Sequence, residues 1–137
     1  MTKQKLPSQK FKTIIRTVKI FLGIVFFLAL TFTGFNLLAK SIYDRKDCKR
    51  FNIDNIELRT HTDIPAVLKS ECNCNGNIKV SKFVIDSSRV NISDYTVNNN
   101  FEKSGDLFIK KGERNDTKWN ASLNPHTNEL LITIEYK

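Results

Sequence analysis

An uncharged stretch at residues 20–39, IFLGIVFFLALTFTGFNLLA, constrains this chain more than any other feature. A helix rises about 1.5 Å per residue, so a helix of this length crosses the roughly 30 Å hydrocarbon core of a bilayer. The stretch therefore predicts a single transmembrane helix. Around it we expect a basic arm at 1–19, a charged stalk at 40–50 and one small domain at 51–137.

Charges on either side of the stretch predict its orientation. Residues 1–19 hold six lysines and arginines and no acidic residue. Basic residues beside a transmembrane segment stay in the cytoplasm, so we expect the N-terminus inside and the C-terminal domain outside, in the periplasm or at the cell surface. The flank after the helix is also basic, which weakens this bias. A cleaved signal peptide is the alternative, because residues 39–41 offer a small-residue cleavage site, although the stretch is longer than an ordinary signal peptide.

The net charge of +8 is mostly a topology signal, because the arm alone contributes +6. A nucleic-acid footprint requires basic residues gathered on a folded domain, so nucleic acid is not an expected partner. The lipid bilayer is an expected partner, with anionic headgroups as the counter-charge of the arm. Phe11, Ile14, Ile15 and Val18 follow a helical period, which fits either an interfacial helix or an earlier start of the transmembrane helix.

Small and polar residues within the stretch suggest a surface for pairing with a second membrane helix. Small residues let helix backbones approach each other, and an asparagine can hydrogen-bond between helices. The candidate pairing residues are Gly23, Ala29, Thr33 and Asn36. Such residues are also ordinary in single membrane helices, and no ionisable residue lies within the stretch to mark an ion path.

Beyond residue 50 the alternation of apolar and polar residues predicts an α+β fold, a mainly antiparallel sheet covered by one or two short helices. The expected strands are 55–60, 78–85, 107–111, 118–123 and 130–136, and residues 83–85 form a continuous apolar run that fits burial on both faces. The last three are expected to form an antiparallel meander, with a turn at Gly112 after the first of them.

Helix and turn signals complete this fold. Pro65 stands well at the first turn of a short helix that includes Val67 and Leu68, because its missing N–H is not needed there. Ser93 is expected to cap a second short helix. The Asn-Gly sequence predicts a tight turn within residues 72–77.

The residues most suggestive of chemistry are three cysteines, Cys48, Cys72 and Cys74. In an oxidising compartment Cys48 is expected to pair with Cys72 or Cys74, since a bridge between the latter two would close a small, strained ring. Three reduced thiols, or a disulfide to another chain, are the alternatives. Zinc held by the cysteines with His61 or His126 is disfavoured, because Cys-x-Cys lacks the ligand spacing of structural zinc sites. We therefore expect no metal and no cofactor.

His61 and Asp63 are the pair closest to a general base with its orienting carboxylate. They fall at the end of an expected strand, where a solvated loop pair is the simpler interpretation. The sequence has no glycine-flanked nucleophile and no glycine-rich phosphate loop. A small domain also has little room for a walled pocket, so we expect neither enzymatic activity nor a small-molecule substrate.

These features predict a single-pass, membrane-anchored domain that binds another protein, most directly an accessory or structural subunit of a larger membrane or envelope complex. A membrane-anchored immunity protein that neutralises a toxin is the alternative, and a small envelope enzyme or metal-binding protein comes third. Trp119 and Tyr136 are candidate partner contacts, although their alternating pattern favours both as core residues. A sheet edge ending at Lys137 is expected to offer a second surface through strand addition.

Overall fold

The computed structural model describes residues 9–137. Residues 1–8, which include Lys3 and Lys5 of the expected cytoplasmic arm, lie outside the described residues. The chain divides into two compact units, Met1–Lys40 and Ser41–Lys137, which are described separately below.

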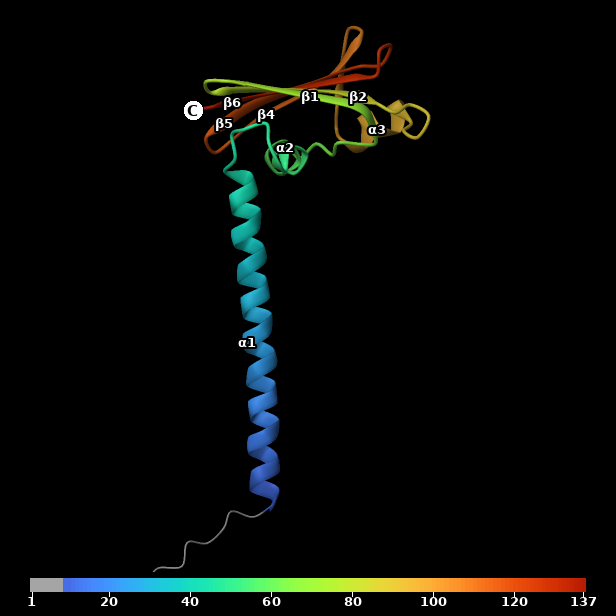
Figure 1. Cartoon of the computed structure of the whole chain (residues 1–137). Helices are drawn as coiled ribbons and strands as arrows, with labels where there is room; N and C mark the ends of the chain where they lie inside the picture. The colour runs from blue at the N-terminus through green and yellow to red at the C-terminus, as the bar shows by residue number, and fades with distance from the viewer. Residues whose placement is uncertain (1–8) are drawn as a thin grey trace, which may run out of the picture. The chain divides into compact units, whose positions relative to one another are not determined.

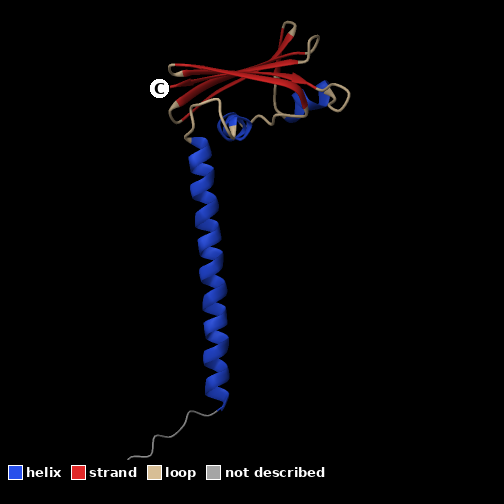
Figure 2. Ribbon diagram, viewed as in Figure 1, coloured by secondary structure: helices blue, strands red, loops and turns tan. Residues whose placement is uncertain are grey.

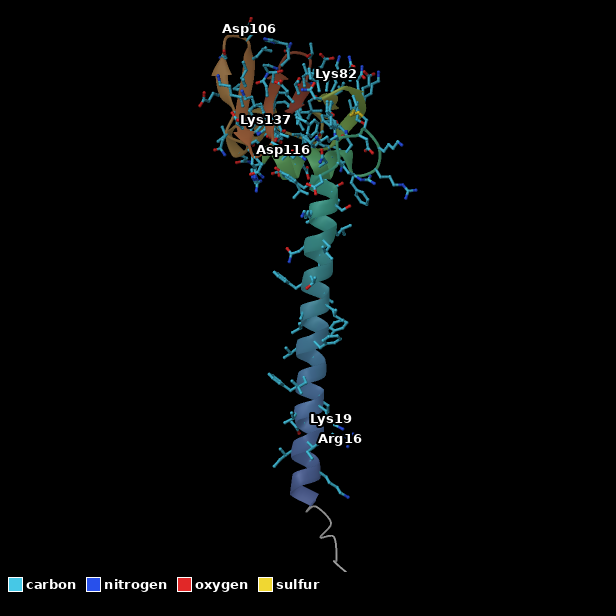
Figure 3. The ribbon with its side chains drawn as sticks, turned by 90° about the vertical axis from the view of Figure 1, so that its left-hand side faces the viewer. Arg16, Lys19, Lys82, Asp106, Asp116 and Lys137 are labelled. Carbon is cyan, nitrogen blue, oxygen red and sulfur yellow. A yellow bond between two sulfur atoms is a disulfide. The ribbon has the colours of Figure 1, made fainter. Side chains whose placement is uncertain are left out.

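The first unit is formed by the helix α1, which spans Gln9–Tyr43 and gives its last three residues to the second unit (Figure 1). The helix is continuous through residues 9–19, with no break between an interfacial part and the uncharged stretch. Its large apolar side chains between residues 14 and 38 are 40% to 73% exposed. Within residues 9–137, one helix is thus long and apolar enough to cross a bilayer, a property that signal sequences share. Arg16 and Lys19 lie close together near its N-terminal end (Figure 3).

The second unit contains a six-stranded antiparallel sheet in the order β1-β2-β6-β5-β4-β3 (Figure 2). Its strands are β1 (Val67–Asn75), β2 (Ile78–Ile85), β3 (Glu102–Ser104), β4 (Leu107–Arg114), β5 (Thr117–Asn124) and β6 (Glu129–Tyr136). The meander of β4, β5 and β6 confirms the sequence prediction. However, β2 returns to pair with the open side of β6, so the expected free edge ending at Lys137 is wrong. The outer strands of the sheet are β1 and β3.

Two short helices, α2 (Asn52–Thr60) and α3 (Ile92–Asn98), lie on the same face of the sheet (Figure 1). The expected helix at α3 is confirmed. Its cap is Asn91 rather than Ser93, because the Asn91 side chain accepts from the backbone N–H groups of Ser93 and Asp94. The strand expected at 55–60 is wrong, because α2 occupies these residues.

β1 replaces the helix expected after Pro65 and part of the turn expected at 72–77. Its side chains are mostly exposed because it is an edge strand, so it lacks the apolar alternation by which strands are recognised. The Asn-Gly signal does mark a hairpin turn, formed by Gly76 and Asn77 alone. Gly76 has a φ of +59°, a conformation that glycine adopts without steric cost.

The core lies between the sheet and the two helices. One cross-strand row on the covered face consists of Phe83, Leu130, Leu123 and Phe108, with Ile85 beyond it. Ile56 of α2 and Tyr95 of α3 belong to the same buried cluster.

The turn expected at Gly112 is wrong, because β4 continues through this residue to Arg114. The Trp119 ring occupies the space above Gly112, and a Cβ there would lie 2.6 Å from the ring atom Cζ2. Glycine is therefore required at this position to make room for a neighbouring side chain, within an unbroken strand.

Candidate functional site

A buried arginine organises the end of the domain near α2. Arg59 is 1% exposed, and its guanidinium carbon lies 4.1 Å from the ring centre of Tyr43 and 4.9 Å from that of Tyr136. Its Nε donates to the backbone oxygen of Tyr43 at 2.8 Å, and its Nη1 donates to Asp116 at 3.2 Å. Burial alone would raise the pKa of Asp116, but the hydrogen bond from Arg59, a backbone hydrogen bond and the charges of Arg59 and Lys46 together outweigh it, and the pKa is lowered.

Asn55 and Lys79 extend this polar cluster. The Asn55 amide nitrogen donates to the backbone oxygens of Ile42, Tyr43 and Arg45 at 2.8 to 3.0 Å. Its side-chain oxygen accepts from the ammonium of Lys79 at 2.9 Å. Lys79 is 1% exposed, and burial lowers its pKa to about 8. The expected stalk, residues 40–50, is thus held to the domain through backbone carbonyl groups at and just after the end of α1. Carbonyl groups at a helix end have no partner within the helix and are free to accept.

Three sulfur atoms lie beneath β1, beside this polar cluster. Cys48 and Cys72 form a disulfide, which is one of the two expected pairings, and Cys74 is a free, exposed thiol. All three Sγ atoms lie within 4.8 Å of one another. Metal-binding cysteines coordinate as thiolates, and the disulfide removes two of the three. Neither expected histidine ligand, His61 or His126, belongs to this cluster.

A hollow of about 420 Å³ lies beside the disulfide. The disulfide forms part of its lining, together with Phe51, Ile53 and Phe83. Phe51 is 48% exposed, so this hollow presents an apolar side chain to solvent next to the disulfide.

His61 and Asp63 do not form the pair that catalysis would require. His61 ends α2 in a left-handed conformation, and its Nε2 accepts a hydrogen bond from Arg114 at 2.6 Å. Asp63 is engaged through its backbone, accepting from the Tyr95 hydroxyl at 2.7 Å. Within residues 9–137, no hydrogen bond joins the His61 and Asp63 side chains.

Within the second unit, no helix or strand covers the face of the sheet opposite α2 and α3 (Figure 2). Because side chains alternate along a strand, residues between the buried positions point to this face. A shallow hollow of about 510 Å³ on it is lined by Lys111, Glu113, Lys118, Asn120, Thr133 and Glu135. Lys82, labelled in Figure 3, forms an ion pair with Glu129 on the same face. This surface, the open face, combines charges of both signs with partly exposed Leu131.

The expected partner-contact residues lie on the other, covered face. Tyr136 is 2% exposed and is therefore a core residue, the alternative that its alternating pattern favoured. Its hydroxyl donates to the backbone oxygen of Arg45 at 3.3 Å. Trp119 is half-buried against the core. A contact through Trp119 stays a prediction, while the Tyr136 ring lies within the domain.

The expected helix-pairing residues occupy two sides of α1. Ala29, Thr33 and Asn36 follow an i, i+4, i+7 spacing and share one face, whereas Gly23 lies about a third of a turn away. Thr33 donates to the backbone oxygen of Ala29 at 2.8 Å, and Asn36 donates to that of Phe32 at 3.0 Å. The polar groups of this face are thus satisfied within the helix, and pairing stays a prediction.

Sequence reasoning missed Asn55, Arg59 and Lys79. The available signal is that Asn55 and Arg59 are four residues apart in a segment that also has Ile56 and Thr60, a helical spacing of the buried side chains. For Lys79 there is no comparable signal, because it stands between Ile78 and Val80, and the alternation predicts that it faces solvent, whereas the structure buries it.

Comparison of the chain with family models, with curated proteins and with solved structures found no match.

Proposed function

We propose that this protein is a single-pass, membrane-anchored protein-binding subunit, non-catalytic, with its domain outside the cytoplasm. The observation that carries the proposal is the exposure of large apolar side chains around α1, which water does not accommodate and lipid does. The Cys48–Cys72 disulfide supports the extracytoplasmic side, since such bonds persist in oxidising compartments. The open face is the proposed binding surface.

The binding surface is tested by recovery of the tagged full chain from native membranes in a mild detergent. We expect a membrane protein to co-purify in a fixed ratio with the wild type. Thr133→Arg, which places a long cation at the centre of the open face, is expected to abolish that recovery. Arg89→Glu, an exposed change in the loop before α3, is the matched control. Recovery of the chain alone, from wild type and variants alike, would contradict a stable subunit.

The role of the anchor is tested separately. Residues 20–39 are replaced by an unrelated apolar segment of equal length, and co-purification is repeated. An accessory subunit that pairs through its helix is expected to lose its partner. Unchanged recovery would favour a guard of the immunity type, for which any anchor on the same side suffices. A reporter fused after Lys137 checks that side, and activity in the cytoplasm alone would contradict the proposed topology.

A further inference from the structure

A free thiol lies beside the disulfide of the domain. Cys74 has its sulfur within 4.8 Å of the sulfurs of both Cys48 and Cys72. Thiol–disulfide exchange needs an accessible thiolate within reach of a disulfide sulfur, and Cys74 is exposed. We propose that Cys74 displaces Cys72 from Cys48, so that the bridge alternates between Cys48–Cys72 and Cys48–Cys74.

The position of Cys74 directs it toward the loop that carries Cys48. Cys72 and Cys74 are two residues apart on β1, so their side chains share one face of the strand. The Cys74 thiol donates to the backbone oxygen of Lys46, with a sulfur to oxygen distance of 3.4 Å. Cys48 follows two residues later, in a segment without helix or strand. Because the Cys74 and Cys48 sulfurs already lie within 4.8 Å of each other, the exchange requires only a short movement of this loop.

A buried cation stands next to the exchange thiol. Lys79 is the residue directly opposite Cys74 in the pairing of β1 with β2, and it is almost fully buried on the same face. Directly opposite residues in an antiparallel pair have side chains close enough to interact. The cation thus stands beside the sulfur that attacks, and exchange proceeds through the thiolate form of that sulfur.

The exchange balances without an external oxidant. The Cys74 thiolate attacks the Cys48 sulfur, the new bond forms as the Cys48–Cys72 bond breaks, and Cys72 leaves as a thiolate. One proton is lost from Cys74 before the attack, and one is gained by Cys72 after it. Ser81 donates a hydrogen bond to the Cys72 sulfur at 3.4 Å, which stabilises the leaving thiolate. Attack on Cys72 itself would close the strained Cys-x-Cys ring.

The exchange changes the hollow beside the disulfide. Cys48 and Cys72 both line it, next to Phe51. Transfer of the bridge to Cys74 draws Cys48 along β1 and leaves Cys72 as a free thiol in the hollow. The surface of the hollow thus has two chemical states, one with the Cys48–Cys72 bridge and one with Cys72 as a free thiol. It does not depend on the proposed protein-binding role of the open face.

Positional peptide mapping of the full chain in detergent tests the exchange. The protein is incubated near neutral pH and quenched in acid. It is then denatured in the presence of N-ethylmaleimide, which alkylates the free thiol, and digested with trypsin. Cleavage leaves Cys48 in residues 47–49 and the other two cysteines in residues 70–79, so both isomers give the same linked peptides. Tandem mass spectrometry then locates the alkyl group on Cys72 or Cys74.

We expect two labelled populations, one carrying the alkyl group on Cys74 and one on Cys72. A sample denatured and alkylated in acid without neutral incubation sets the background of scrambling. Label on Cys74 alone, at every incubation time, would overturn the proposal. This result is obtained on the wild-type protein, so it does not depend on whether a variant folds.

The contribution of Lys79 has its own readout, the rate at which iodoacetamide alkylates Cys74. This reagent reacts with the thiolate, and Lys79→Met removes the cation opposite Cys74, so the variant is expected to react more slowly at neutral pH. Lys82→Met, on the open face of the same strand, is the matched control and is expected to react at the wild-type rate. Equal rates in the two variants would contradict activation by Lys79.

Discussion

The two ends of the covered sheet face bury different kinds of side chain, apolar at one end and charged at the other. At one end the row of Phe83, Leu130 and Leu123 is wholly apolar, and each side chain is fully buried. At the other end Arg59 and Lys79 are buried to the same degree. No buried side-chain nitrogen or oxygen within residues 9–137 lacks a hydrogen-bond partner. One end is thus stabilised by area removed from water, and the other by complete pairing of its polar groups.

This difference has consequences for how each end responds to change. Burying a large apolar side chain stabilises by about 1.5 to 3 kcal/mol, and the effect has no preferred direction, so similar shapes substitute for one another. Burying a charge is costly unless every polar atom is matched, so removing one partner leaves the others unpaired. We therefore expect the apolar end to tolerate conservative changes that the polar end does not.

The largest effect is expected from Arg59→Ala. The substitution removes the Arg59 donor from Asp116 and one of the two donors of the Tyr43 carbonyl, and it opens a space between two tyrosine rings. The free energy of unfolding should therefore fall by about 2 to 5 kcal/mol. The measurement is denaturant unfolding of the full chain in detergent, followed by fluorescence of Trp119, the single tryptophan. Arg89→Ala, an exposed change, is the control. A loss below about 1 kcal/mol would mean that the cluster is not a stabilising unit.

Conservative substitutions sharpen the same contrast. Phe83→Leu is expected to lower the free energy of unfolding by less than about 1.5 kcal/mol. Arg59→Lys is expected to lower it by more, because an ammonium reproduces neither the planar stacking nor the two directed hydrogen bonds. Equal losses would remove the distinction between the two ends.

The pH dependence of stability isolates the buried lysine of the polar end. Burial lowers the pKa of Lys79 from 10.5 to about 8, so above pH 8 the unfolded chain binds the proton that the folded domain has lost. The free energy of unfolding should therefore rise between pH 8 and 10, by about 2 kcal/mol. Measurements in a Cys74→Ser background avoid disulfide exchange. Lys79→Met should remove most of the rise, and an unchanged slope would contradict this assignment.

Other buried titratable groups set the pH range over which this rise in stability is expected. Burial also lowers the pKa of Lys110, which contributes to the rise in the same direction. Burial raises the pKa of Tyr136 to about 12 and also raises that of Tyr95. Above pH 10 the folded domain therefore retains protons that the unfolded chain releases, and stability should fall again.

Gly112→Ala tests the close packing at the polar end. The added methyl would lie 2.6 Å from the Trp119 ring, so the ring must move, at a cost of about 1 to 2 kcal/mol in the free energy of unfolding. The loss is measured by denaturant unfolding followed by far-ultraviolet circular dichroism. Trp119→Leu removes the obstacle, so adding Gly112→Ala to that variant should cost little. An equal cost in both backgrounds would point to the backbone rather than the ring.

The contrast between the ends also explains what could be predicted from the sequence. Strands β5 and β6 were predicted because their buried positions alternate with exposed ones. β2 and β4 were predicted from their β-branched and other apolar residues, although the buried positions at the start of β2 are Lys79 and Ser81 rather than Ile78 and Val80. α2 was missed because Asn55, Arg59 and Thr60 occupy most of its buried face, and a pattern of apolar residues does not register them. Arg59 is buried because it meets Tyr43 and Asp116, which are 16 and 57 residues away in the chain. A pattern of neighbouring residues in the sequence cannot predict partners that are so far away in the chain.

The candidate site was predicted to a similar extent. The compartment rule and ring strain reduced the disulfide to two pairings, and the structure selects Cys48–Cys72. The selection depends on where residues 44–51 run, and the buried Asn55 holds this segment through the Arg45 carbonyl. The cross-strand position of Lys79 opposite Cys74 likewise follows from the hairpin register. The number of residues in the turn sets this register, and the sequence placed that turn only within residues 72–77.

The smallest expected effect is at the cap of α3, near the apolar end. Asn91 accepts from the backbone N–H groups of Ser93 and Asp94, so Asn91→Ala should lower the free energy of unfolding by about 1 kcal/mol. Ser93→Ala, at the cap expected from the sequence, is the matched control and should cost only a few tenths. Denaturant unfolding followed by Trp119 fluorescence compares the two. If Ser93→Ala proved the more costly, the helix would begin two residues later, and this end would also depend on a polar contact that the alternating pattern does not reveal.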